Sequence, residues 1–156
     1  MAIEKVIEYF RAFGAEDKIK QFDVSSATVE LAAQALGCEG ARIAKTMSFL
    51  VDGHAVLVVT AGDMKIDNAK FKAQFHTKAK MLTAEQLDEL VGHAPGGVCP
   101  FAVADGCETY LDESLKRFGI VYPAAGNAAS AVELTIPELE KYSAFLGWVD
   151  VCKEKE

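Results

Sequence analysis

The sequence predicts an α+β fold in which helices flank a mixed, mainly antiparallel sheet. Two pairs of β-rich segments are each joined by an Asp-Gly dipeptide, which suits the positive φ angles of a tight hairpin turn: residues 46–51 with 55–61, and residues 101–104 with 107–111. Helical patterns occur around these pairs at irregular intervals, so the regular β-α-β alternation of a parallel sheet is absent. The chain has 156 residues, of which 51% are hydrophobic, and this predicts one domain over residues 1–156.

Helix signals are strongest where capping residues precede an apolar pattern. Thr83–Gln86 and Thr135–Glu138 match capping boxes, in which the first and fourth side chains each bond the other residue's backbone amide. They predict helices to Val91 and through Phe145, and Gly92 should end the first of these two. Further helices are predicted at residues 3–13, 28–36, 67–75 and 112–117.

Short β-rich segments predict the remaining strands. Residues 56–59, Val-Leu-Val-Val, show no polar alternation, so their strand should be central and covered on both faces. Additional strands are expected at residues 18–24, 78–82, 120–122, 131–134 and 148–151.

Composition argues against several classes of protein. A net charge of −7 opposes nonspecific binding to nucleic acid such as DNA, which requires clustered Lys and Arg. No apolar run approaches the ~20 residues that span a bilayer, and the first residues carry acids where a signal peptide would be basic. A soluble cytoplasmic protein without membrane contact is therefore expected. The four cysteines contain no Cys-x-x-Cys pair and the three histidines show no ligand spacing, so reduced thiols and no metal site are expected.

One basic segment interrupts this acidic chain. It lies between Met64 and Leu82, where a single acid, Asp67, accompanies five lysines. These are Lys65, Lys70, Lys72, Lys78 and Lys80. A solvated helix face would explain such a run, and so would contact with a polyanion.

The segment Leu90–Phe101 concentrates residues that shape a rigid loop. It reads Leu-Val-Gly-His-Ala-Pro-Gly-Gly-Val-Cys-Pro-Phe, with three glycines and two prolines between a predicted helix and a predicted strand. Glycine lets backbone amides face a cavity without a Cβ in the way, and proline fixes φ. The pattern indicates a stiff loop whose amides face a ligand, although an ordinary turn before a strand would also explain glycine and proline here.

Three features together resemble the YbaK/EbsC family, relatives of the editing domain inserted in bacterial prolyl-tRNA synthetase. They are Lys45 within Ala-Lys-Thr at the start of a strand, Gly62-Asp63 after the next strand, and Gly96-x-x-x-Pro100 within the loop. The resemblance implies a strongly curved, barrel-like sheet and a free-standing aminoacyl-tRNA deacylase that acts in trans without a metal or organic cofactor. Lys45 falls on the family's invariant lysine.

An aminoacyl ester is already activated, so such a site mainly has to position a water and stabilise charge on the carbonyl oxygen. Backbone amides near Gly96 and Gly97 would form the oxyanion hole, in which one donor is typically worth ~2.7–4 kcal/mol. Lys45 would bind the terminal-adenosine phosphate or the ester oxygen, because its charge repels the substrate's α-ammonium. This mechanism expects the Lys45 ammonium and the loop amides to line one shared cleft.

Further residues complete the predicted site. The expected substrate-binding residues are Thr46, Asp63, His93, Val98, Cys99, Pro100 and Asn127. The expected contacts to the tRNA acceptor stem are Lys65, Lys70 and Lys72. The predicted partners are the acceptor end of an aminoacylated tRNA and prolyl-tRNA synthetase.

Two alternatives assign this chain a different function. Cys99, in an amide-rich loop near His93, would be the nucleophile of a cysteine-dependent hydrolase if local dipoles lowered its pKa. Alternatively, the fold would serve as a non-enzymatic module that binds a small ligand or tRNA.

The amino-acid specificity stays open at this point. The resemblance implies Cys-tRNA(Pro), or a related small amino acid on tRNA, as the substrate. Relatives that clear Cys-tRNA(Pro) carry an Arg-Gly-Leu-Asp-like run, whereas the aligned segment here is Asn127–Glu133, without the acidic side chain expected near Ala131. A small pocket for alanine would also fit this segment.

Overall fold

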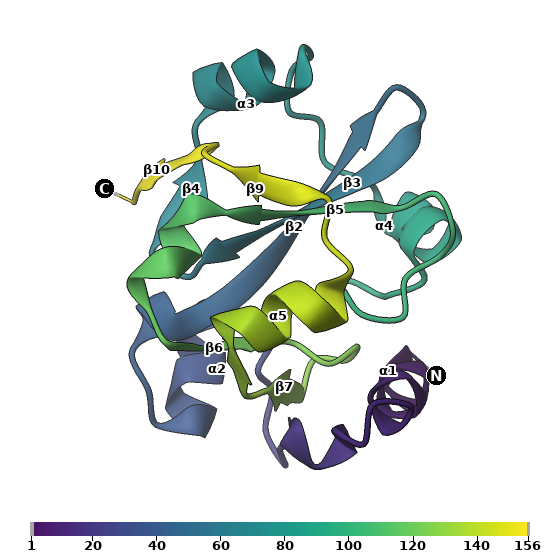
Figure 1. The fold of residues 1–156 in the computed structure, drawn as a ribbon, viewed down its shortest axis with the longest axis vertical. Helices are drawn as coiled ribbons and strands as arrows, with labels where there is room; N and C mark the ends of the chain where they lie inside the picture. Colours follow the sequence, from purple (N-terminus) through teal and green to yellow (C-terminus); the bar gives the residue numbers. More distant parts are fainter. Residues whose placement is uncertain (1, 156) are drawn as a thin grey trace.

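The computed structural model describes residues 2–155 and contains a strongly curved mixed sheet flanked by helices (Figure 1). Six strands form the main sheet in the order β8-β6-β2-β3-β5-β9. Their bounds are β2 Ile43–Val51, β3 His54–Ala61, β5 Glu108–Asp112, β6 Ile120–Pro123, β8 Leu134–Thr135 and β9 Gly147–Val149. Two small antiparallel pairs accompany it: β1 Ile19–Gln21 with β7 Ser130–Val132, and β4 Met64–Ile66 with β10 Cys152–Glu154.

The helices begin at the capping residues that the sequence predicts. Thr28, Asp67 and Asp112 each accept a backbone amide with their side chains, and capping boxes are present at Thr83 and Thr135. The α-helices are α1 Ala2–Arg11, α2 Val29–Leu36, α3 Asn68–Phe75, α4 Ala84–Gln86 and α5 Ile136–Ser143. Shorter helical turns are η1 Glu16–Lys18, η2 Gly40–Arg42, η3 Leu87–Val91 and η4 Glu113–Arg117. Within residues 2–155 no helix is long and apolar enough to cross a membrane.

The β2–β3 hairpin forms the centre of the sheet and confirms the first predicted hairpin. Asp52 and Gly53 turn the chain with φ of 50° and 82°. The two strands pair in unbroken antiparallel register from Val51↔His54 to Ala44↔Ala61. The predicted burial of β3 on both faces is also confirmed, because residues 55–61 are each no more than 1% exposed.

The second predicted hairpin is wrong. Residues 101–104 form no strand, and β5 pairs in parallel with β3 instead. Phe101 is fully buried and packs edge-on against Phe10, with ring centroids 4.9 Å apart. Ala104 N–H donates to Val91 O at 3.0 Å. Core packing and the end of η3 therefore hold this segment away from β5.

The mixed character of the sheet is confirmed, although its antiparallel pairs lie partly outside the main sheet. Of the seven strand pairings in the described residues, four are antiparallel: β1–β7, β4–β10, β2–β3 and β6–β8. The three parallel pairings, β2–β6, β3–β5 and β5–β9, all belong to the main sheet. The strand predicted at residues 78–82 is reduced to one antiparallel bridge between Met81 and Phe49.

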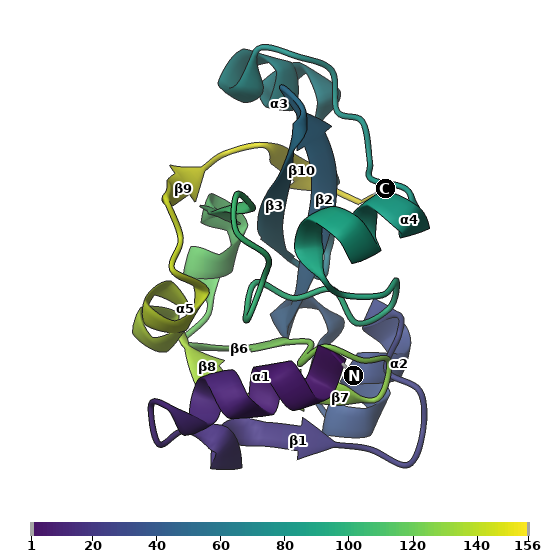
Figure 2. The ribbon, with the colours of Figure 1, turned by 90° about the vertical axis from the view of Figure 1, so that its right-hand side faces the viewer.

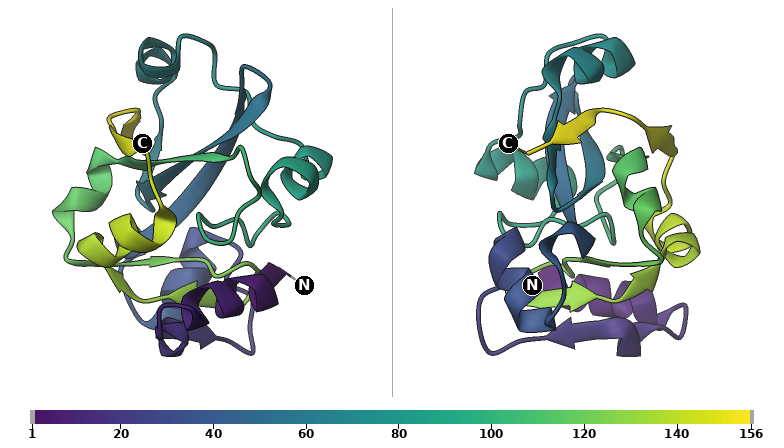
Figure 3. Two further views of the ribbon diagram at one scale, coloured as in Figure 1. Left: turned by 45° about the vertical axis from the view of Figure 1, so that its right-hand side comes forward. Right: turned by 90° about the vertical axis from the view of Figure 1, so that its left-hand side faces the viewer.

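The two faces of the hairpin pack against different parts of the chain. Alternate side chains of β2, at positions 45, 47, 49 and 51, point to what we call the α3 face, where Phe49 packs on Phe71 with ring centroids 4.6 Å apart. Positions 44, 46, 48 and 50 point to the opposite face, which packs on η3 and residues 98–101 and which we call the loop face. Figure 3 shows α3 and α4 on different sides of the hairpin, and Figure 2 shows α1, β1 and β7 at the end of the molecule opposite α3.

Candidate active site

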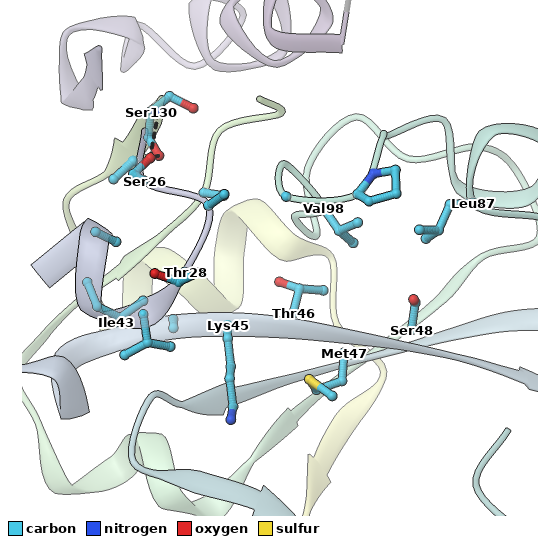
Figure 4. A pocket seen from close by; sticks show the side chains of 18 of the residues that line it. Ser26, Thr28, Ile43, Lys45, Thr46, Met47, Ser48, Leu87, Val98 and Ser130 are labelled. Atoms are coloured by element: carbon cyan, nitrogen blue, oxygen red, sulfur yellow. Dashed lines mark hydrogen bonds between the residues drawn. The ribbon is translucent and has the colours of Figure 1, made fainter. Parts of the chain in front are cut away.

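A cavity of about 490 Å³ opens on the loop face of β2 (Figure 4). It is bounded by the start of α2, the middle of β2, residues 95–98 of the glycine loop, and the stretch from β6 to β7. Hydroxyl side chains supply most of its polar lining: Ser26, Thr28, Thr46, Ser48, Tyr122 and Ser130. Among the described residues, no Asp or Glu lines this cavity.

Glycine is required where the loop meets the opposite wall of the cavity. A Cβ on Gly97 would lie 2.6 Å from both the backbone nitrogen and the Cα of Asn127, which is far inside van der Waals contact. Gly96 has φ +87°, and a Cβ there would lie 3.4 Å from the Cβ of Ala27 and 3.5 Å from that of Ala128. The glycine loop, residues 126–128 and the segment before α2 therefore pack together with almost no space between them.

The two ends of the glycine loop are tied down. His93 is 1% exposed, and its Nε2–H donates to Phe101 O at 2.8 Å, which joins one end of the loop to the other. Lys5 Nζ on α1 donates to Gly92 O at 3.1 Å, so the first helix also holds the loop. His93 thus positions the loop from the core and does not line the cavity.

Only some backbone amides of the glycine loop have a hydrogen-bond acceptor. Gly97 N–H donates to Ala94 O at 3.1 Å and closes a tight turn. Gly96 and Val98 line the cavity, and neither amide has an acceptor within residues 2–155. Two unpaired backbone donors are therefore available in the loop, which lies across from β2 in Figure 4. Gly96 and Val98, rather than Gly96 and Gly97, carry these donors.

A small hydrogen-bond network closes the wall between α2 and β7. Ser26 N–H donates to Ala128 O at 2.6 Å, and Ser130 N–H donates to Ser26 Oγ at 3.1 Å. Asn127 uses its side-chain oxygen to accept Ala129 N–H at 2.9 Å, so this side chain shapes the turn instead of lining the cavity. The sequence does not single out Ser26 or Ser130 as site residues, because isolated serines in loops carry no distinctive pattern.

The outer edge of β2 carries alternate backbone groups that do not bond β3. In an antiparallel pair, every second residue turns both its N–H and its C=O away from the partner strand. Ser48 and Leu50 do so, because Leu82 N–H donates to Ser48 O at 3.2 Å and Leu50 N–H donates to Lys80 O at 2.8 Å. Thr46 precedes Ser48 by two residues and faces the same edge.

This edge is open at Thr46. β6 pairs only with residues 43–44, and the segment 80–82 covers the edge only from residue 48 onward. Within the described residues no group pairs with the N–H or C=O of Thr46, and its Oγ1 is buried without a hydrogen-bond partner. Residues from both faces of β2 line the cavity, Lys45 and Met47 as well as Thr46 and Ser48, so the cavity wraps around this edge.

The structure does not bring the Lys45 ammonium into a shared cleft with the loop amides, and this prediction is wrong. Successive strand residues point to opposite faces, so the Lys45 side chain leaves on the α3 face while Thr46 points toward the loop (Figure 4). Lys45 Nζ donates to the backbone oxygen of Met64 in β4. Gly96, Val98, Thr46 and Lys45 therefore all line the cavity, but the Lys45 ammonium points away from the other three.

The Lys45 ammonium lies in an unfavourable electrostatic environment. Burial lowers the pKa of this amine to about 8, and the neighbouring ammonium of Lys155 adds to the shift. Asp63 lies on the same side, but Arg117 engages its carboxylate at 2.6 and 2.9 Å and lowers its pKa. Asp63 does not line the cavity, which departs from its predicted role in substrate binding.

Cys99 is a core residue. Its side chain is fully buried, and burial raises the pKa of the thiol to about 12, so a thiolate nucleophile does not form near neutral pH. Cys99 packs in the cluster around Phe101, and neither it nor the buried Pro100 lines the cavity. The structure contradicts the cysteine-dependent hydrolase.

The predicted tRNA-contact lysines lie on the α3 side of the molecule. Lys70 donates to Asp150 at 3.1 Å and to Cys152 O at 2.9 Å, so its charge is already partnered. Lys65 lies on β4, and Lys72 is exposed on α3. None of the three lines the cavity.

Solved structures share this fold over nearly the whole chain. A crystal structure described as a proposed trans-editing enzyme for prolyl tRNA synthetase aligns with a TM-score of 0.87 at 26% identity, covering 99% of this chain and 98% of that one. A second structure, of the hypothetical protein APE2540, aligns with a TM-score of 0.82 at 26% identity, covering 96% of this chain and 99% of that one.

The chain belongs to the aminoacyl-tRNA editing domain family, which matches residues 23–142. The uncharacterised protein YwhH of Bacillus subtilis is 46% identical over 157 residues, and the match covers both chains completely. Prolyl-tRNA ligases match over a part of their length: that of Desulfovibrio desulfuricans is 32% identical over 124 residues, which are 80% of this chain and 21% of the ligase. That of Leuconostoc citreum is 30% identical over 115 residues, 73% of this chain and 20% of the ligase. The chain thus spans about a fifth of these ligases, and the family resemblance read from the sequence is confirmed.

Proposed function

We propose that this chain is a trans-acting deacylase that hydrolyses the ester bond of mischarged aminoacyl-tRNA. The observation that carries the proposal is the cavity on the loop face, which has unpaired loop amides on one wall and an unpaired strand edge on another. Its volume of about 490 Å³ is that of a small-ligand pocket. Membership of the editing-domain family supports this reaction class.

The proposed reaction needs no nucleophile from the protein. A water oxygen attacks the ester carbonyl carbon, and the bond between this carbon and the ribose oxygen then breaks. Of the two protons of the water, one goes to the ribose oxygen and the other is released to solvent, so the amino acid leaves as a carboxylate. The amides of Gly96 and Val98 stabilise the oxyanion of the tetrahedral intermediate, where one donor is typically worth ~2.7–4 kcal/mol. A neighbouring ribose hydroxyl of the tRNA orients or activates the water.

Lys45 remains our candidate for the cation that meets the terminal phosphate. Lys45 lines the cavity beside Thr46, where the edge of β2 is open. On the α3 face the amine is partly desolvated and faces the ammonium of Lys155. A phosphate at the strand edge would favour the charged form and draw the side chain around the edge.

The substrate amino acid is small. The cavity wall includes the short side chains of Ala27, Ala44 and Ala131 beside larger apolar ones such as Met81 and Leu87, and its polar groups are mainly hydroxyls. This lining suits the methyl group of alanine and the thiol of cysteine. It offers no carboxylate, among the described residues, for a cationic side chain.

The tRNA approaches along the segment that leads from α3 to α4. Met81 lines the cavity, and its neighbour Lys80 is exposed, so Lys80 and Lys78 stand nearest to a bound acceptor end. Lys72, Lys70 and Lys65 lie farther along the same basic run. Because the substrate is a charged tRNA, we place the protein in the cytoplasm and regard prolyl-tRNA synthetase as its functional partner.

A deacylation assay tests the proposal. The protein is incubated with tRNA(Pro) charged with Cys, Ala or Pro, and with Ala-tRNA(Ala), and release of the amino acid is followed. We expect release of Ala or Cys from tRNA(Pro) and retention of Pro. If every charged tRNA stays intact while tRNA still binds, the chain is a binding module and the proposal fails.

A further inference from the structure

An aminoacyl-tRNA carries an α-ammonium group for which the side chains of the cavity supply no negative charge. The α-ammonium of an aminoacyl ester is a cation with several N–H donors, yet no carboxylate lines the cavity within the described residues. Burying such a cation without acceptors is costly. If the proposed function holds, its acceptors must come from backbone carbonyls and hydroxyl groups.

The open edge at Thr46 supplies these groups in one place. Its C=O and Oγ1 are acceptors, its N–H is a donor, and none of the three has a partner within residues 2–155. In an antiparallel sheet, one residue can exchange both hydrogen bonds with the residue opposite, since the N–H of each meets the C=O of the other. An extended aminoacyl group carries the same pair of groups, an amino N–H and a carbonyl oxygen, on one side.

We propose that the backbone of Thr46 binds the aminoacyl group of the substrate as a one-residue antiparallel strand. The α-ammonium donates to Thr46 C=O and to Thr46 Oγ1, which is buried in the free protein and reaches the substrate by rotation of the Thr46 side chain, and the ester carbonyl accepts from Thr46 N–H. The amino acid thereby fills the open part of the β2 edge. This part begins after Ala44, the last residue paired with β6, and ends at Ser48, the first residue covered by the 80–82 segment.

The direction of this pairing predicts which substrates are refused. In antiparallel orientation the amino end of the substrate points toward Ser48, where Leu82 N–H already donates to Ser48 O at 3.2 Å. The ester end points toward Ala44 and the stretch after β6. The slot therefore holds one residue and has no space for a group attached to the amino nitrogen. Free aminoacyl-tRNA fits this slot, whereas N-acylated aminoacyl-tRNA meets the backbone of the 80–82 segment and lacks the positive charge.

The first test compares alanyl-tRNA(Pro) with N-acetyl-alanyl-tRNA(Pro) on the wild-type protein. Loss of a charged hydrogen bond predicts a fall in kcat/KM of about 10–100-fold for the acetylated substrate. Equal kcat/KM for the two substrates would overturn the inference and leave the deacylase intact. Failure to hydrolyse either one would instead count against the proposed function.

The second test separates the backbone of Thr46 from its side chain. Thr46→Val removes only the hydroxyl, and loss of one charge-assisted hydrogen bond to the α-ammonium predicts a loss of about 10–100-fold. Thr46→Pro also removes the N–H, which β2 does not use in its ladder with β3 and which faces the locally open stretch of the strand. In Thr46→Pro protein that still unfolds cooperatively, we expect a further loss of about 10-fold or more. If folded Thr46→Pro protein were as active as Thr46→Val, the Thr46 amide would not bind the ester carbonyl.

A third readout needs neither turnover nor the proline variant. The non-cleavable analogue 3′-alanylamido-adenosine is added to the wild-type protein, and amide hydrogen exchange is measured residue by residue. Exchange at Thr46 should slow on binding, whereas Met47, whose amide already lies in the ladder with Val58, should not change and serves as the internal control. Binding that protects Gly96 or Val98 but leaves Thr46 unprotected would refute the one-residue strand. Absence of any binding would count against the aminoacyl site as a whole.

Discussion

Gly97 lies flat against the backbone of Asn127, and this contact joins the glycine loop to the far wall of the cavity. A Cβ at Gly97 would lie 2.6 Å from two backbone atoms of Asn127, neither of which belongs to a flexible side chain. The loop can therefore stay in place only if residue 97 is glycine. The position of the neighbouring Gly96 and Val98 amides depends on this contact.

We predict that Gly97→Ala displaces the loop. The overlap should destabilise the protein by about 1–3 kcal/mol, as overpacking does elsewhere, and should lower deacylation at least as strongly as loss of one oxyanion donor, ~100-fold. Thermal unfolding and single-turnover deacylation measure the two effects. Gly119→Ala is the matched control, because a Cβ there meets no heavy atom within 4 Å. If Gly97→Ala were as stable and active as this control, the contact would not position the site.

Lys45 should show opposite effects on stability and activity. Its pKa in the folded protein, about 8, lies below the ordinary value of 10.5, so the unfolded chain binds more protons between these two pH values. Stability should therefore rise with pH from about 8 to 10.5, and the cost of the charged amine is fully present below pH 8. We expect Lys45→Met to unfold at a higher temperature than the wild type at pH 7 and to lose this rise.

The same variants test the catalytic proposal. Lys45→Met and Lys45→Ala should lose deacylation while remaining folded, if the ammonium meets the terminal phosphate. Lys155→Met is the control, since it removes the neighbouring positive charge but keeps Lys45, and it should raise the pKa of Lys45 toward 10.5. Undiminished turnover of Lys45→Ala would remove this residue from the mechanism.

Features that depend on neighbouring residues could be predicted from the sequence. Capping boxes and the Asp52-Gly53 turn involve groups a few residues apart, so the sequence alone specifies them. The Asp105-Gly106 turn is equally local and is present, but the hairpin predicted around it does not form. What decides that region is the burial of Phe101, a long-range contact that no dipeptide signals.

The candidate site could be predicted only in part, because some of its residues are joined by long-range contacts. The glycine loop and Thr46 could be identified, but the serine network between Ser26 and Ser130 joins residues 104 positions apart. The direction of the Lys45 side chain follows from the strand pattern alone. Strand residues alternate between faces, so adjacent Lys45 and Thr46 cannot both point at the loop. The open edge at Thr46 depends on where β6 ends, and only the structure reveals that.

His93 should make the protein less stable in mild acid. Burial lowers the pKa of this histidine below its ordinary 6.5, so the unfolded chain binds the proton more readily than the folded one. The stability contributed by neutral His93 is present above pH 6.5 and is lost as pH falls through the lowered pKa. We therefore expect the unfolding temperature to fall between pH 7.5 and 5.5. His93→Gln, which keeps a donor for Phe101 O but does not titrate, should show a smaller fall. An identical fall in both proteins would show that His93 does not cause it.

The path of the tRNA can be located by reversing single charges along the basic run. Lys80 is exposed, has no ion-pair partner among the described residues, and adjoins Met81 at the cavity. Each phosphate contact contributes about 0.7–0.9 to the slope of log affinity against log salt concentration. Lys80→Glu should therefore raise KM strongly at low salt and flatten the salt dependence by at least this amount, and Lys78→Glu should do so to a lesser degree.

Lys70→Glu provides the contrast, because Lys70 already pairs with Asp150 at 3.1 Å on the α3 side. Reversing it places two acids together, so it should lower the unfolding temperature with little change in the salt dependence of KM. Lys72→Glu, at an exposed position on α3, should have an intermediate effect if the acceptor stem continues along the helix. Measuring KM at two salt concentrations for all four variants decides between the paths. A larger effect at Lys70 or Lys72 than at Lys80 would mean that the stem crosses α3 and reaches the cavity from another side.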